Sequence, residues 1–193
     1  FNDTDKHHWQ HAAAAARAAL AVDPKQPDAL GLLAESLLAD GLQHGSTGEV
    51  ASGRKAITDA LGAGALGPNL ARAQALGAIA GNQGAAAVTK LKPLLAASPN
   101  DPYLHLYDGW AQLANHDAAS AIKALDPVVG NAHVKEPALV ARGLAKLALG
   151  QVSAAHDDFA AALASDKDDV AAMVDLAAAT PAVRASLYRL GLG

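Results

Sequence analysis

Three histidines near the start of the sequence, His7, His8 and His11, could bind a divalent metal. His7 and His11 are four residues apart, so on a helix both imidazoles would lie on one face. Two imidazoles without a carboxylate or thiolate ligand make a weak site. We therefore interpret the cluster as a solvated helix end, and we predict neither a physiological metal nor another cofactor.

A glycine-rich segment from Gly62 to Gly67 spells GxGxxG, the pattern of dinucleotide-binding loops. In those proteins the pattern follows a β-strand and opens a βαβ unit, so that phosphates meet a helix N-terminus. Here the residues before Gly62 have a helical pattern instead. We interpret the segment as a flexible connection between two helices.

The remaining candidates for chemistry are weaker. Asp166, Asp168 and Asp169 lack the glycine and the distal glutamate of a calcium loop, and they suit the cap and first turn of a following helix. No Ser-His-Asp, paired-carboxylate or lysine-centred group stands out. The scattered histidines share no face in the sequence; they are His44, His105, His116, His133 and His156. We expect no enzymatic activity.

The composition indicates the elements that must position any functional side chain. Of 193 residues, 50 are alanine and 27 are leucine, while only 4% are aromatic. Alanine is the strongest helix former and β-branched residues are sparse, so we predict an all-α protein of closely packed helices. A chain of this length can form one domain with a sizeable core.

Charge and hydropathy exclude two classes of partner. The net charge is -4 and no stretch concentrates basic residues, which argues against nucleic-acid binding. The most apolar run, 12–22, contains Arg17 and is shorter than the roughly 20 residues that span a bilayer, so we predict no transmembrane segment. The absence of cysteine selects no compartment. Because the chain begins at Phe1, we interpret it as a processed or excised piece and predict no localisation.

A period of 34 residues runs through the sequence. At that spacing, small residues recur in two columns, large apolar residues in a third, apolar residues of mixed size in a fourth, and turn-forming residues in register with them. The columns are Ala75, Gly109 and Gly143; Ala87, Ala121 and Ala155; Leu91, Leu125 and Phe159; Leu94, Val128 and Ala162; and, at the turns, Asn82, His116 and Gly150. Pro93 and Pro127 share the spacing, and we expect them to end or bend the second helices.

This pattern resembles the tetratricopeptide repeat, a helix-turn-helix unit of 34 residues, and 139–166 is the best single copy. The resemblance implies a single domain over 1–193, a right-handed α-α superhelix of about four full repeats with partial repeats at its ends. The expected divisions are 6–24 (second helix of a truncated repeat), 27–67 (a repeat with a seven-residue insertion between its helices), 68–101, 102–135 and 136–169 (repeats), and 170–190 (a partial repeat and C-terminal capping helix).

The columns also predict how the helices pack. Small residues in the first helix of each unit would let the second-helix alanines touch it, while Leu91, Leu125 and Phe159 fill the space on either side. Ser46 and Glu49 form a capping-box pattern that would start the second helix of the first copy. The resemblance further implies an ion pair between Arg142 and Asp158 within one repeat.

In the tetratricopeptide family the first helices line a concave groove that binds a partner segment. Carried over by register, the candidate partner-binding residues are Arg72, Leu76, Tyr103, Leu106, Trp110, Leu113, Val140 and Leu144. The groove would be apolar with Arg72 as its sole cation, which argues against the carboxylate clamp of chaperone-binding members. Four of these residues have the spacing i, i+3, i+7 and i+10, which places them on one face of a helix; they are Tyr103, Leu106, Trp110 and Leu113. The spacing leaves open whether a partner or the core covers that face.

The implied function is a non-enzymatic scaffold or adaptor that binds a hydrophobic or amphipathic protein or peptide segment in this groove. Two alternatives stay open. The chain could build a homo-oligomeric structural scaffold by stacking repeat ends, or it could be a regulatory or targeting domain of a larger enzyme. The alanine- and glycine-rich composition suggests a bacterial source.

Overall fold

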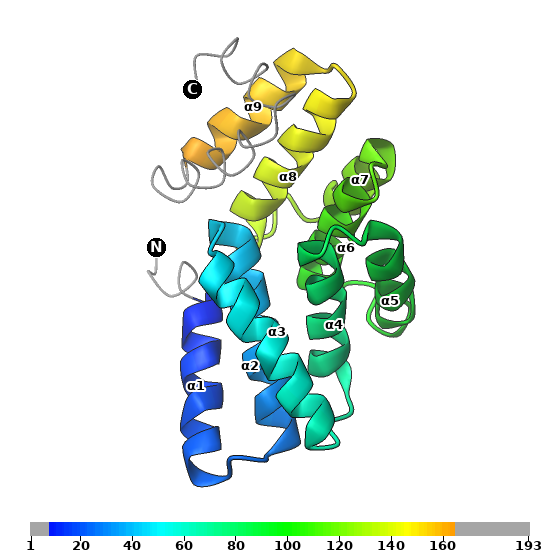
Figure 1. The fold of residues 1–193 in the computed structure, drawn as a ribbon. Coiled ribbons are helices and arrows are strands. Elements are labelled where there is room, and N and C mark those ends of the chain that lie inside the picture. Colours follow the sequence, from blue (N-terminus) through cyan, green and yellow to red (C-terminus); the bar gives the residue numbers. More distant parts are fainter. Residues whose placement is uncertain (1–7, 165–193) are drawn as a thin grey trace. The chain divides into compact units, whose positions relative to one another are not determined.

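The computed structural model describes residues 8–164, which form helices and connections without any β-strand (Figure 1). The prediction of an all-α protein is therefore confirmed for this range. The helices are α1 (His8–Val22), α2 (Pro27–His44), α3 (Thr47–Gly62), α4 (Pro68–Ala80), α5 (Gly84–Ala97), α6 (Pro102–Ala114), α7 (Ala118–Leu125), α8 (Lys135–Ala148) and α9 (Val152–Leu163). His7, the acidic run at 166–169 and the expected C-terminal partial repeat lie outside the described residues.

The chain divides into two compact units, Phe1–Pro99 and Asn100–Gly193. In the first unit, α2 packs against α1, α3 and α4, and α5 packs against α4. In the second unit, α6 pairs with α7 and α8 pairs with α9, while α8 also contacts α6 and α7. Each unit is thus built from helical hairpins packed against their neighbours in the chain.

Helix starts repeat at the predicted spacing. The helices α4 and α6 begin at Pro68 and Pro102, which are 34 residues apart, and α5, α7 and α9 begin at Gly84, Ala118 and Val152. A proline suits the first helical position because its missing N–H has no intrahelical acceptor there. Because these helix starts depend on local residue types, they recur with the 34-residue period of the sequence.

Side-chain caps begin four of the described helices, which are α2, α3, α6 and α7. Ser46 Oγ accepts a hydrogen bond from the Glu49 backbone N–H at 3.3 Å, which confirms the predicted start of α3. The Asp101 carboxylate accepts hydrogen bonds from the first backbone N–H groups of α6. Each cap satisfies donors that the helix itself leaves without an acceptor.

The predicted turn column is confirmed by the backbone. Asn82, His116 and Gly150 all have positive φ angles, of 55°, 60° and 74°. Each residue closes the turn between the two helices of a hairpin. Glycine and asparagine tolerate this left-handed conformation, whereas histidine adopts it at a cost.

Within the hairpins, glycines of the first helix face large side chains of the second. An ideal Cβ on Gly109 would lie 2.5 Å from Leu125 Cγ, and one on Gly143 would lie 2.6 Å from Phe159 Cε1. The atoms nearest to these two glycines belong to the large apolar column, four residues after the alanine column. The missing Cβ atoms make room for these fully buried side chains.

The first hairpin has longer helices than the others. The helix α2 has 18 residues and α3 has 16, against 13 in α4 and α6. The insertion expected between the helices instead lengthens them, since Gly41 to His44 belong to α2 and only Gly45 and Ser46 separate it from α3. Gly45 has a φ of 69° and ends α2 in the left-handed conformation.

The two prolines that share the 34-residue spacing act differently. Pro93 lies inside α5, which continues to Ala97, whereas α7 ends at Leu125 before Pro127. Asp126, the residue before Pro127, still has helical dihedral angles, with φ of -50° and ψ of -41°. The prediction that both prolines end or bend their helices is confirmed only as an end in α7.

Candidate functional site

The predicted partner-binding residues fall on three helices. Arg72 and Leu76 lie on α4 in the first unit, and the other six lie on α6 and α8 in the second. Three of the set are buried, and these are Leu76, Leu106 and Val140; the half-buried ones are Arg72, Tyr103, Trp110, Leu113 and Leu144. The half-buried side chains are the ones that keep surface for a partner.

An aromatic pair lies at the centre of α6. The ring centroids of Tyr107 and Trp110 are 5.9 Å apart and their planes differ by 28°, so the rings stack. Tyr107 is fully buried, while Trp110 is only half-buried. Trp110 is therefore held against the core by one ring contact and keeps part of its surface exposed. Tyr103, two helical turns earlier, shares this face.

Two leucines of the predicted set contribute to packing within the second unit. Leu113 packs against the cluster of Ala118, Ala121 and Ala145. Leu144 packs against the cluster that contains Phe159. Both remain partly exposed, and Leu113 lies on the same face of α6 as Trp110, three residues later.

A half-buried carboxyl group follows Tyr107 in the same helix. Burial raises the pKa of Asp108, while the hydrogen bond from Gln112 Nε2 to Asp108 Oδ1, at 3.2 Å, lowers it less. An apolar environment disfavours the charged form of a carboxyl group. Asp108 is two positions before Trp110, about 200° around the helix, so this carboxyl group of weakened acidity lies on another side of α6 than Tyr103 and Trp110.

Arg72, the sole cation that the sequence places in the groove, has a buried anionic neighbour. Its Nη1 atom lies 3.6 Å from Oε1 of Glu35 on α2, and Glu35 is only 3% exposed. The signal was present in the sequence, since Glu35 is an acidic residue in an otherwise apolar stretch of helix. The Arg72 charge is thus compensated inside the first unit.

The ion pair implied by the repeat resemblance is present. Arg142 donates two hydrogen bonds to Asp158, from Nε at 3.0 Å and from Nη2 at 2.6 Å. Lys146 Nζ lies 2.7 Å from the same carboxylate, and Arg142 Nη1 also donates to Asp126 at 2.9 Å. Hydrogen bonding to Asp158 is the largest cause that raises the pKa of Arg142. Asp158 is buried, so this network holds α8 and α9 together.

The structure brings together a carboxyl pair that the sequence did not reveal. Asp40 on α2 and Glu49 on α3 are hydrogen-bonded to each other across the turn between the helices. His44 Nδ1 lies 3.1 Å from Asp40 Oδ1. The absence of a paired-carboxylate pattern in the sequence was therefore misleading, because helix packing creates this pair.

The two carboxyl groups have opposite pKa shifts. The hydrogen bond to Asp40, with burial, raises the pKa of Glu49 to about 7. For Asp40 burial raises the pKa, but hydrogen bonds with His44 and Glu49 and the charge of His44 outweigh it, so the pKa is lowered. Below about pH 7, Glu49 is therefore the protonated member of the pair and Asp40 is the charged one, until the pH falls to the lowered pKa of Asp40.

The histidines at the start of α1 do not form a larger cluster in the described range. The rings of His8 and Trp9 make an edge-on contact, with 4.8 Å between the ring centroids, and Trp9 is buried. Within residues 8–164, no group of three or more His, Cys, Asp or Glu residues could hold a metal ion. The glycine-rich segment joins α3 to α4, with Gly64 and Gly67 at positive φ.

Comparison with known proteins does not identify a family. None of the helices in the described range is long and apolar enough to cross a membrane. No protein-family model matches the chain, and no curated protein matches it. Function is therefore inferred from the geometry of the described side chains.

Proposed function

We propose that the chain is a non-enzymatic scaffold of tetratricopeptide-like hairpins that binds a hydrophobic or amphipathic protein segment. The 34-residue spacing of helix starts, the left-handed residue in each hairpin turn and the glycines that face large apolar side chains support this assignment. Repeated hairpins present the same face of successive first helices, which suits an extended partner.

The half-exposed Trp110 is the observation that carries the proposal. Stacking on the buried Tyr107 limits the motion of its ring, so a partner loses little side-chain entropy on binding it. Tyr103 extends the same face by two helical turns, and Leu113 continues it three residues after Trp110. An amphipathic helix with apolar residues at i, i+3 or i+4, and i+7 would match this face.

A displayed library of 20-residue amphipathic peptides tests the proposal even though the natural partner is unidentified. We expect enriched peptides to bind the wild-type chain and to lose about tenfold or more in affinity for Trp110→Ala. The matched control is Leu149→Ala, which truncates an exposed leucine outside the α6 face. Circular dichroism would establish that both variants fold. Equal binding by both variants, or a library without enriched peptides, would contradict the proposal.

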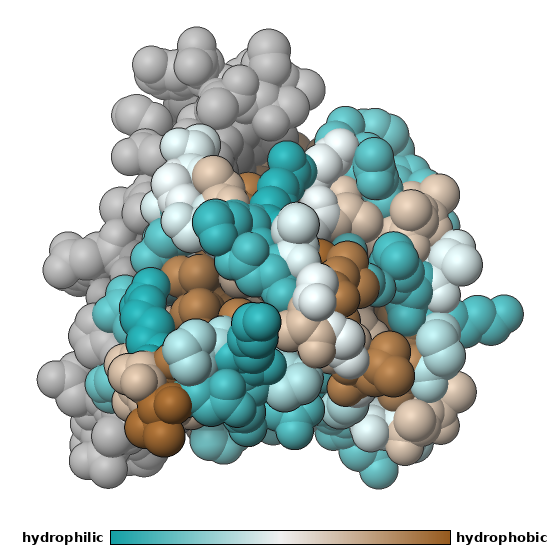
Figure 2. All heavy atoms as spheres, turned by 60° about the horizontal axis from the view of Figure 1, so that its bottom comes forward, coloured by the Kyte–Doolittle hydropathy of each residue, from teal (hydrophilic) through white to brown (hydrophobic). Residues whose placement is uncertain are grey.

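A specific observation also favours self-association. Large apolar residues are exposed in the first unit, with Val22 at 89%, Leu61 at 52% and Leu66 at 86%. Figure 2 shows apolar residues on its face as separate spots among hydrophilic ones. Sedimentation velocity of the wild type and of the double variant Val22→Asp/Leu66→Asp separates self-association from the peptide-binding function. If the chain stacks through these residues, the wild type should sediment as an oligomer and the variant as a monomer.

A further inference from the structure

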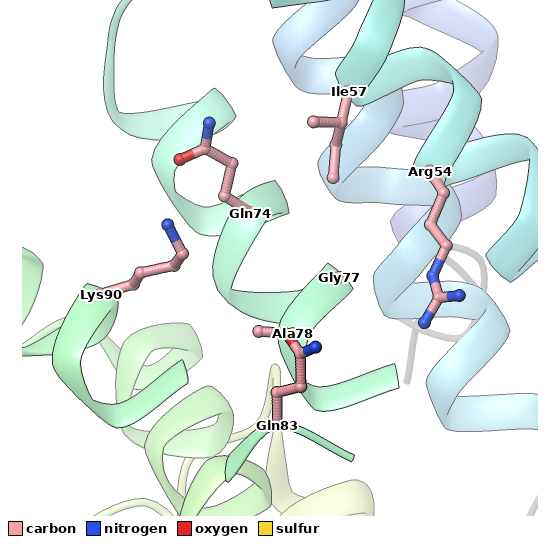
Figure 3. Close-up of a pocket in the computed structure, with 7 residues that line it drawn as sticks. All are labelled: Arg54, Ile57, Gln74, Gly77, Ala78, Gln83 and Lys90. Atoms are coloured by element: carbon pink, nitrogen blue, oxygen red, sulfur yellow. The ribbon is translucent and has the colours of Figure 1, made fainter. Parts of the chain in front are cut away.

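An open cleft of about 350 Å³ lies in the first unit, where α3, α4 and α5 meet (Figure 3). Its charged residues are Arg54 from α3 and Lys90 from α5, and its amides are those of Gln74 and Gln83. None of these residues belongs to the α6 face of the proposed function. The cleft is therefore a second candidate surface.

The cleft has a positive charge although the whole chain is acidic. The described residues that line it include two cations and no carboxylate, while the chain has a net charge of -4. Figure 3 shows Lys90 and Gln74 on one side of α4, Arg54 and Ile57 on the other, and Gln83 below Ala78. A local excess of positive charge attracts an anionic ligand.

Neighbouring cations on α3 have different surroundings. The ammonium group of Lys55 lies 2.6 Å from the carboxylate of Asp59 on the same helix. Arg54 instead lies near Gly81 at the end of α4, where an ideal Cβ would be 3.2 Å from its Nη2 atom. The carbonyl groups at a helix C-terminus attract cations, which favours this position of the guanidinium group beside the cleft.

Ile57, Gly77 and Ala78 form the apolar part of the cleft lining. A Cβ on Gly77 would lie 3.2 Å from Ile57 Cδ1, so the isoleucine packs closely against α4, and its side chain is half-buried. Glutamine amides both donate and accept hydrogen bonds, as the backbone of an extended peptide requires. The cations come from two helices on opposite sides of α4, an arrangement that suits two separated carboxylates better than one phosphate (Figure 3).

We propose that this cleft binds an extended acidic peptide segment of a protein partner. Two carboxylates of the segment lie at Arg54 and Lys90, an apolar side chain lies on Ile57, and the peptide backbone bonds to Gln74 and Gln83. The site would give the scaffold a second, charge-selective contact, in addition to the aromatic face of α6.

The test uses fluorescein-labelled octapeptides, each with one leucine and two glutamates that are separated by one to five residues. Fluorescence anisotropy with the whole chain is measured at low salt. We expect at least one peptide to bind, and its affinity to fall about tenfold or more when glutamine replaces both glutamates. The same affinity should fall as sodium chloride is added, a measurement that needs no variant.

Two double variants remove equal charge from the same two helices. Arg54→Gln/Lys90→Gln should weaken binding by about tenfold or more, while Lys55→Gln/Lys92→Gln, outside the cleft lining, should retain affinity within about twofold. Trp110→Ala should also retain it, which separates failure of this proposal from failure of the proposed function. Circular dichroism would establish that the exposed substitutions leave the fold intact.

Three outcomes would overturn the proposal. The first is that no peptide binds more tightly than its glutamine counterpart. The second is an equal loss of affinity in the two double variants. The third is displacement of the peptide by inorganic phosphate at a low concentration, when sodium chloride at the same ionic strength leaves the peptide bound. The cleft would then be a site for small anions.

Discussion

The ring of Phe159 lies against the backbone of Gly143, so that a Cβ on the glycine would come within 2.6 Å of the ring's Cε1 atom. Gly109 and Leu125 have the same relationship one repeat earlier, at 2.5 Å. Glycine is therefore required at these helical positions by the large side chain opposite, in spite of its low helix propensity.

Replacement of Gly143 by alanine should destabilise the chain. Overpacking against Phe159 costs about 1–3 kcal/mol, and the higher helix propensity of alanine returns about 1 kcal/mol, so we expect a net loss of up to about 2 kcal/mol. Urea unfolding would measure it. Gly48→Ala is the control, because a Cβ there meets no atom within 4 Å. Equal stability changes in the two variants would show that the ring can move away at no cost.

Loss of the Asp158 charge should also lower stability. Asp158 is buried and binds both Arg142 and Lys146, so Asp158→Asn would leave two cations with weakened acceptors and cost about 3 kcal/mol. Its sequence neighbour provides the control, since Asp157 is 80% exposed and Asp157→Asn should change the free energy of unfolding by less than about 0.5 kcal/mol. A loss below about 1 kcal/mol for Asp158→Asn would contradict the structural role of the network.

His116 should be replaceable with a gain in stability. Its φ of 60° costs an L-residue about 1–2 kcal/mol, whereas glycine adopts it freely, so His116→Gly should stabilise the chain by about 0.5–1 kcal/mol after the entropy of glycine is counted. The preceding residue, Asn115, has a φ of -87°, and Asn115→Gly should instead destabilise. Thermal unfolding would compare both. A loss for His116→Gly would indicate that the histidine side chain makes contacts worth more than the strain.

The carboxyl pair predicts how stability depends on pH. The pKa of Glu49 is raised from 4.5 to about 7, so the folded chain holds this proton more tightly than the unfolded chain. Its contribution to the free energy of unfolding is complete below about pH 4.5 and is lost as the pH rises through about 7. The lowered pKa of Asp40 acts in the opposite sense, with stability lost as the pH falls through its folded value.

Glu49→Gln isolates the contribution of that proton. The glutamine amide can donate to Asp40 at every pH, so the variant should lack the Glu49-dependent decline in stability, and its advantage over wild type should grow between about pH 4.5 and 7. His44 and Arg17, the cations whose charges act on Glu49, are unchanged in the variant. Urea unfolding at a series of pH values measures the difference, with Asp28→Asn as an exposed control. Parallel pH profiles for wild type and Glu49→Gln would disprove the shared proton.

Local backbone preferences allowed much of the fold to be predicted. The helix starts at Pro68 and Pro102, the cap at Ser46 and the left-handed turn at Gly150 depend on residue types within a few positions. The Arg142–Asp158 pair was also expected, because a repeat resemblance specifies which positions of its two helices face each other. Such features follow the 34-residue period and do not depend on how distant segments pack.

The candidate site could be predicted only in part. The spacing of Tyr103, Leu106 and Trp110 placed them on one face of α6, and it could not decide that Leu106 is buried while Trp110 stays half-exposed. Exposure depends on the neighbouring helices, and a period of 3.6 residues says nothing about what covers a face. For the same reason the cleft beside Arg54 has no sequence signature.

The sequence by itself determined the helical class, the hairpin period and the residues that begin and close each hairpin, because these depend on short-range conformational preference. Only the tertiary structure decided that Phe159 lies on Gly143, that Glu35 accompanies Arg72 and that Asp40 lies beside Glu49 and raises the pKa of that carboxyl group. These contacts join side chains from different helices. Their distances and pKa shifts are set by how closely the helices pack, which residue types along one chain do not specify.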